Sequence, residues 1–96
     1  MQKTQKNIQK ILKDRKKLVS WLLLEAKDES DMYDILEDIL TPAEIVEIGE
    51  RIMLMQELKT WKSQRQVAED LWMSVTTVNR GARILTYGTW IMDKLL

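Results

Sequence analysis

Residues 64–83 have the sequence QRQVAEDLWMSVTTVNRGAR, and this stretch decides the fold. Two short amphipathic segments flank a break at residues 72–73, which predicts a helix-turn-helix unit. Ser63 and Ser74 stand where each helix would begin, and serine is a preferred N-cap residue. Ser63 and Gln66 together have the spacing of a capping box. The stretch therefore predicts two crossed helices in an all-α chain.

The spacing of the apolar residues predicts how these two helices pack. Val67, Leu71 and Val78 fall on the faces that must meet. Ala68 is small, as a close helix crossing requires. The second helix, beginning at Val75, then turns its small polar and basic side chains outward, and the N-terminal turn of such a helix is the part that enters a DNA major groove.

We expect the outward side chains to divide the contacts with DNA. Gln64 and Arg65 would meet phosphate and a base, while Val75, Thr76 and Asn79 would face base edges. Thr77, Arg83 and Lys62 would position the phosphate backbone. The bland interpretation of the same residues is a solvated surface on two packed helices, and the acid-free recognition helix favours DNA binding over it.

The rest of the chain has helical periodicity and no alternation long enough for a strand. Thr41, Pro42 and Glu44 predict the start of a long helix, with Thr41 as N-cap, Pro42 at the first position and Glu44 completing a capping box. Ser30 is expected to cap the helix before it. Gly88 is expected to separate a last short helix.

We expect one domain over residues 1–96 with about six helices. Residues 1–17 form a basic N-terminal arm or helix start, and residues 18–60 a helical dimerisation core. Residues 63–83 form the helix-turn-helix, and residues 84–96 the C-terminal helix. The lysines of the arm either add a salt-dependent DNA contact or are solvated, and we favour the second interpretation; they are Lys3, Lys6, Lys10 and Lys13.

Composition narrows the function. Fifteen Lys and Arg balance fifteen Asp and Glu, but the charges are segregated into a basic arm, an acidic middle and a mildly basic C-terminal half. The chain has neither His nor Cys, which removes the commonest general base and the thiolate nucleophiles and metal ligands. With no membrane-span or signal-peptide pattern either, we expect a cytoplasmic protein that is no enzyme and binds no metal.

From Leu40 onward the chain resembles the tryptophan repressor family of bacterial helix-turn-helix proteins. The stretches that carry the resemblance are Leu40-Thr41-Pro42, Gly49-Glu50-Arg51, Ser63-Gln64-Arg65, Thr77-Val78-Asn79-Arg80-Gly81 and Leu85-Thr86-Tyr87-Gly88. The resemblance implies an intertwined all-helical homodimer that presents two recognition helices to a pseudo-palindromic operator in double-stranded DNA. It also implies a transcriptional regulator, most simply a repressor.

The resemblance further implies an effector site, with L-tryptophan as the candidate co-repressor. By the family pattern, Arg80 meets the ligand carboxylate and one ring face, Arg51 covers the other face, Thr41 serves the polar end and Gly81 leaves room for the ring. Guanidinium groups are suited to both tasks. The bland alternatives are that Arg51 pairs with the acidic segment 44–50 and that Arg80 contacts phosphate.

Four departures from the family pattern bear on function or operator preference, and one of them is a residue missing between the third helix and Ser63. Ile84 stands where tryptophan-binding members have a serine for the ligand ammonium, Asp38 replaces an apolar residue near the pocket mouth, and Ala68 replaces a DNA-reading lysine. Ile84 and Asp38 favour an effector-independent regulator of the same fold; the alternative for Asp38 is that it pairs with the ligand ammonium. The zero net charge and acidic middle favour a helical interaction module that does not bind DNA.

The tryptophans depart from the pattern in another way. Trp61, Trp72 and Trp90 all fall where the family prefers glycine. One hypothesis is a codon that some bacteria translate as Gly and others as Trp. The alternative is that Trp61 and Trp90 are single surface or core aromatics and that Trp72 packs on the dimer. Trp21, in the first helix, fits either interpretation.

Overall fold

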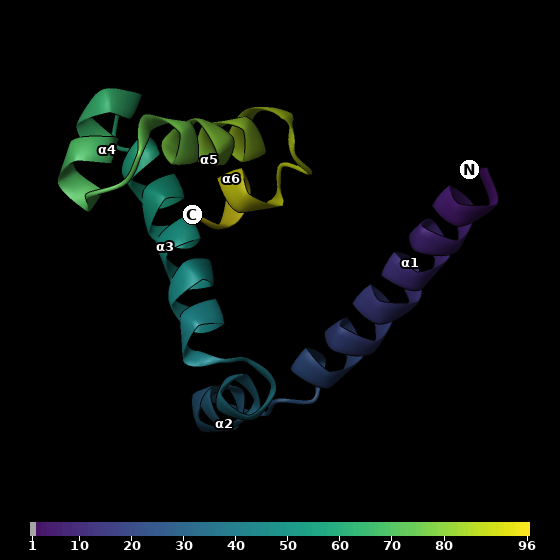
Figure 1. Ribbon diagram of the computed structural model, residues 1–96. Coiled ribbons are helices and arrows are strands. Elements are labelled where there is room, and N and C mark those ends of the chain that lie inside the picture. The colour runs from purple at the N-terminus through teal and green to yellow at the C-terminus, as the bar shows by residue number, and fades with distance from the viewer. Residues whose placement is uncertain (1) are drawn as a thin grey trace. The chain divides into compact units, whose positions relative to one another are not determined.

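The protein is described here by a computed structural model that covers the backbone of residues 2–96 and the side chains from residue 7 onward. Lys3 and Lys6 therefore lie outside the described side chains. Six α-helices follow along the described backbone, which forms no strand, and both the all-α class and the helix number are confirmed (Figure 1). The helices are α1 (Gln2–Leu24), α2 (Glu29–Ile39), α3 (Pro42–Leu58), α4 (Gln64–Leu71), α5 (Val75–Tyr87) and α6 (Ile91–Leu95).

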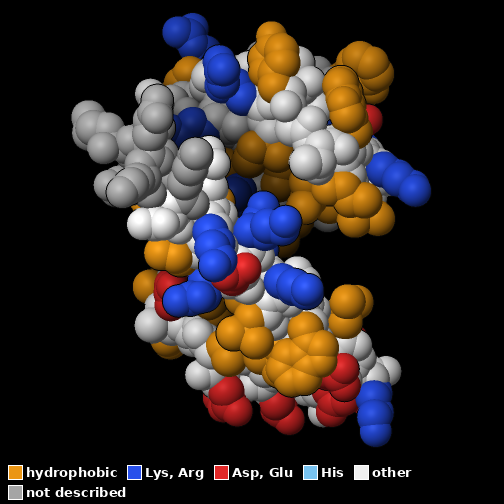
Figure 2. Space-filling model, turned by 90° about the vertical axis from the view of Figure 1, so that its right-hand side faces the viewer, with side chains coloured by type: hydrophobic (Ala, Val, Ile, Leu, Met, Phe, Trp, Pro, Cys, Tyr) orange, Lys and Arg blue, Asp and Glu red, His pale blue; other side chains and the backbone are white. Residues whose placement is uncertain are grey.

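The chain divides into two compact units, Met1–Pro42 and Ala43–Leu96. The first unit contains α1 and α2, and none of its described side chains, from residue 7 to residue 42, is buried. The apolar stripe of α1 is instead exposed; it comprises Ile8, Ile11, Leu12, Leu18 and Val19, which are 47–60% exposed. Apolar side chains also form exposed patches among the charges in Figure 2.

The second unit contains the core. Val67 and Val78 are fully buried between α4 and α5, and Ala68 is 6% exposed beside them. Leu54 and Met55 complete the buried cluster from the C-terminal half of α3. The predicted inward positions of Val67, Ala68 and Val78 are thus confirmed, and the partly buried residues packed around them include the predicted Leu71.

The helix starts agree with the sequence at three positions and differ in two details. Helix α3 begins at Pro42, and the hydroxyls of Ser63 and Ser74 accept the backbone N–H groups of Gln66 and Thr77, each at 3.1 Å. The capping box at Ser63 is only half formed. The Gln66 amide donates to the Asp70 carboxylate at 2.8 Å, because an acceptor four residues along the helix lies on the same face.

The predicted cap of α2 is wrong. Asp28, and not Ser30, is the N-cap: its carboxylate accepts the N–H of Asp31 at 2.9 Å. Aspartate caps helices as well as serine does, so α2 begins at Glu29 and Ser30 lies within its first turn. Along the described chain, no helix combines the length and apolarity needed to cross a membrane.

Candidate functional site

Helices α4 and α5 form the expected helix-turn-helix. Residues 72–73 make the turn, and α5 begins at Val75, directly after its cap Ser74. The predicted DNA-facing side chains on α5 all lie on the surface; they are Val75, Thr76, Thr77, Asn79 and Arg83. On α4, Arg65 is exposed and Gln64 is half-buried. The fold thus brings the predicted set onto one pair of helices.

Hydrogen bonds join several members of this set. The Asn79 side-chain amide donates to the side-chain oxygen Oε1 of Gln64 at 3.3 Å, which links the first turn of α4 to the middle of α5. The hydroxyls of Ser74 and Thr77 lie 2.8 Å apart, so Thr77 is held against the helix cap. The Arg83 guanidinium lies 5.5 Å from the centre of the Tyr87 ring, within the range of a cation–π contact.

Lys62, which precedes α4, forms two ion pairs. Its ammonium pairs with Glu57 at 2.7 Å and with Asp70 at 2.9 Å. The hydrogen bonds that Lys62 donates to these two carboxylates raise the pKa of Lys62, and the bonds that Asp70 accepts from Lys62 and Gln66 lower the pKa of Asp70. The predicted phosphate contact of Lys62 stays a prediction. In the free protein, its ion pairs with Glu57 and Asp70 link the end of α3 to α4.

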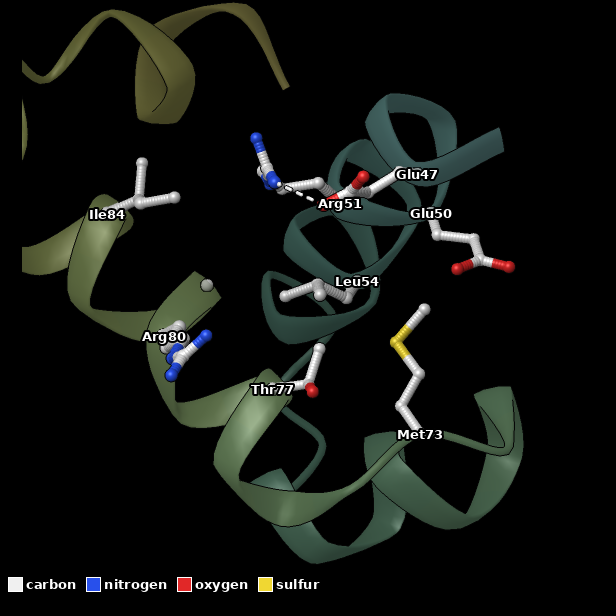
Figure 3. Close-up of a pocket in the computed structure, with 9 residues that line it drawn as sticks. Glu47, Glu50, Arg51, Leu54, Met73, Thr77, Arg80 and Ile84 are labelled. Atoms are coloured by element: carbon white, nitrogen blue, oxygen red, sulfur yellow. Dashed lines mark hydrogen bonds and ion pairs between the residues drawn. The ribbon is translucent and has the colours of Figure 1, made fainter. Parts of the chain in front are cut away.

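A cavity of about 200 Å³ opens between α3 and α5 (Figure 3). Three of the four predicted effector residues line it, namely Arg51 from α3 and Arg80 and Gly81 from α5. The rest of the lining is Glu47, Glu50, Leu54, Met73, Thr77 and Ile84. Thr41 belongs to the other unit, as does Asp38, and their predicted roles stay predictions.

Both positively and negatively charged side chains line the cavity. The Arg51 guanidinium pairs with the Glu47 carboxylate at 3.3 Å, so the alternative partner proposed from the sequence is present and Arg51 lines the cavity as well. Our sequence analysis missed Glu47 and Glu50 as lining residues. Glu47 lies one turn before Arg51, and this helical spacing was the signal for it; Glu50 is adjacent to Arg51 and had no such signal.

At Gly81, α5 packs closely against a side chain of α3. A Cβ atom at this position would overlap Cδ1 of Leu54, whose side chain points from α3 toward α5 (Figure 3). The glycine therefore allows the two helices to meet at the edge of the cavity. Ile84, one turn further along α5, contributes an apolar wall where the resemblance implies a serine in tryptophan-binding relatives.

Comparison with known proteins assigns the chain to a family. A model of the Trp repressor protein family matches residues 13–96. The chain belongs to the Trp repressor family. It is 42% identical over 62 residues to Trp operon repressor homologs of Xylella fastidiosa, and this match covers 64% of the chain and 67% of each relative.

A solved structure agrees with this assignment. The chain is similar to a TrpR like protein from Eubacterium eligens, with a TM-score of 0.75 and 28% identity over 82% of this chain and 81% of that one. The predicted family is therefore confirmed. Membership of the Trp repressor family makes the protein a regulator of this type, in agreement with the expected class of function.

Proposed function

We propose that this member of the Trp repressor family is a homodimeric, sequence-specific DNA-binding repressor whose affinity for its operator is set by a small effector. The observation that carries the proposal is the solvent-exposed N-terminal turn of α5. Val75, Thr76 and Asn79 stand there without an acidic neighbour on the helix, since α5 contains no Asp or Glu. Such a surface can approach phosphates closely enough to contact base edges.

The hydrogen bonds of the unit support this role. A reading helix must hold its side chains in fixed positions, and the Asn79–Gln64 and Ser74–Thr77 bonds restrict two of them, Asn79 and Thr77, before DNA arrives. Less side-chain entropy is then lost on binding. Two arginines of the proposed contact set, Arg65 and Arg83, are exposed and supply attraction to phosphate.

The exposed apolar residues of the first unit support a dimer. A stripe of five aliphatic side chains along α1 is about half exposed, and no described side chain from residue 7 to residue 42 is buried. Large exposed apolar patches mark association surfaces. A second copy of the chain would supply the missing core, and its two-fold axis would place two α5 helices on a pseudo-palindromic site.

The cavity supports an effector that acts through α5. Because Arg51 lies on α3 and Arg80 on α5, a ligand that contacts both would favour one position of the reading helix relative to the core. A volume of about 200 Å³ is below the usual range of about 300–1,000 Å³ for drug-sized ligands, so the effector is small. Cationic and anionic side chains together suit a zwitterion such as L-tryptophan.

An effector-independent regulator is the second candidate. Arg51 already has a partner in Glu47, and Ile84 offers no acceptor for an ammonium group. In that case the cavity is a gap in the packing and DNA affinity does not change with tryptophan. A helical interaction module without DNA binding is the third candidate, and the exposed apolar stripe of α1 is the feature that favours it.

Selection of bound DNA from a random duplex pool, with and without tryptophan, distinguishes the three. A single enriched pseudo-palindrome whose recovery rises with tryptophan supports the proposal. Equal recovery in both arms, together with no heat in a calorimetric titration of tryptophan, selects the effector-independent regulator. No enrichment at low salt would refute DNA binding and leave the interaction module.

A further inference from the structure

Three described residues other than glycine have a left-handed backbone, and all three are tryptophan. The φ angles of Trp61, Trp72 and Trp90 are 69°, 56° and 70°. A positive φ brings Cβ close to the backbone, so a bulky L-residue rarely adopts it, whereas glycine does so without cost. By contrast, none of the three glycines, Gly49, Gly81 and Gly88, has a positive φ.

Trp61 and Trp72 follow the ends of helices, and Trp90 directly precedes one. Trp72 is the C-cap of α4, with φ 56° and ψ 40°, and its N–H donates to the carbonyls of Ala68 and Glu69. Trp61 follows the end of α3 at Leu58, and Trp90 is the left-handed N-cap of α6, with φ 70° and ψ −6°. A left-handed residue after a helix is a position that glycine fills more often than any other residue.

The indole rings at these positions are mostly exposed to solvent. Trp61 is 98% exposed and Trp72 is 96% exposed. Trp90 is 63% exposed and lines, with Trp61, a shallow apolar groove that also includes Leu58 and Leu85. Burial of the rings therefore does not explain the left-handed backbone at Trp61 and Trp72.

Trp21 provides an internal contrast. It lies inside α1, where the helix gives it a negative φ, and it is 57% exposed beside the apolar stripe. Glycine inside a helix would weaken it. The fourth tryptophan thus has the environment of a genuine tryptophan, and the other three have the environment of glycines.

We propose that residues 61, 72 and 90 are glycine in the protein as its own cell makes it, and that only Trp21 is tryptophan. The codon UGA is translated as tryptophan in some bacterial genetic codes and as glycine in others, so one wrongly assigned codon accounts for all three positions. Under this proposal UGA encodes the three positions, and UGG encodes Trp21. The groove beside Trp61 and Trp90 then loses both rings and is no binding site.

Peptide sequencing by mass spectrometry of the protein isolated from its source cell is the decisive test. Glycine at all three positions with tryptophan at position 21 supports the proposal. Tryptophan at any of the three overturns it. The codons of the gene provide a second check, because UGG at position 61, 72 or 90 also overturns the proposal.

Thermal unfolding of recombinant variants tests the backbone argument separately. Trp72→Gly should raise Tm by about 4 °C or more, since it removes the left-handed strain. Trp72→Ala removes the same ring but keeps a Cβ, so its Tm should lie below that of Trp72→Gly. Trp21→Gly should lower Tm. If Trp72→Gly were less stable than Trp72→Ala, the strain argument, and the proposal with it, would fail.

Discussion

Replacing Thr76 by Asp should weaken DNA binding strongly and leave the fold at least as stable. Thr76 is the second residue of α5 and is exposed, so an aspartate there loses no buried contact. A carboxylate in the first turn of a helix interacts favourably with the helix dipole, by about 0.3–1 kcal/mol. The free energy of unfolding should therefore rise slightly or stay unchanged.

The effect on DNA binding has the opposite sign. A carboxylate about 4 Å from a phosphate is repelled by about 1 kcal/mol in water and by about 4 kcal/mol at the lower effective dielectric of a protein surface. Two reading helices double this to about 2–8 kcal/mol. Since about 1.4 kcal/mol is a factor of ten, binding should weaken by about 30-fold or more.

A mobility-shift titration on the selected operator measures the loss, and urea unfolding measures stability. Thr76→Asn is the matched control, because it has nearly the same shape as aspartate without the charge and should lose much less affinity. If the aspartate variant were stably folded and bound the operator as tightly as the parent protein, α5 would not face DNA and the proposed function would be wrong.

Three further predictions concern the cavity, the core and the charges. Arg80→Ala should reduce the change in operator affinity caused by tryptophan, because Arg80 lines the cavity, while Arg83→Ala should weaken DNA binding with and without tryptophan alike; an unchanged response in Arg80→Ala would contradict the effector site. Val78→Ala should lower the free energy of unfolding by about 2–3 kcal/mol in urea titrations, since Val78 is fully buried and the change leaves a cavity; a loss well below 1 kcal/mol would contradict the packing. Lys62 lowers the pKa of Asp70, so this pair stabilises the fold above the ordinary carboxyl pKa of 3.8, and the contribution is lost as pH falls through the lowered value. Lys62→Met should raise the Asp70 midpoint in an NMR titration, and an unmoved midpoint would show that the pair is not formed in solution.

Local sequence patterns were sufficient to predict the helices of this protein. The Ser63 and Ser74 caps, the start of α3 at Pro42 and the buried faces of α4 and α5 all follow from short-range spacing. These features depend on residues within one or two helical turns, so a pattern in the sequence contains the necessary information. The N-cap of α2 was misplaced because Asp28 and Ser30 are nearly equivalent caps two residues apart.

Local sequence patterns did not predict the contacts between segments far apart in the chain. Three sets of contacts depend on how α3, α4 and α5 cross. Glu47 and Glu50 share a cavity with Arg80, Lys62 pairs with Glu57 and Asp70, and Asn79 bonds to Gln64. No local pattern encodes a crossing angle. The sequence alone determined which helices form and which faces are apolar, because caps and periodicity act over a few residues. Only the tertiary structure decided which charges meet and where the cavity opens, because those distances are set by the packing of side chains far apart in the chain.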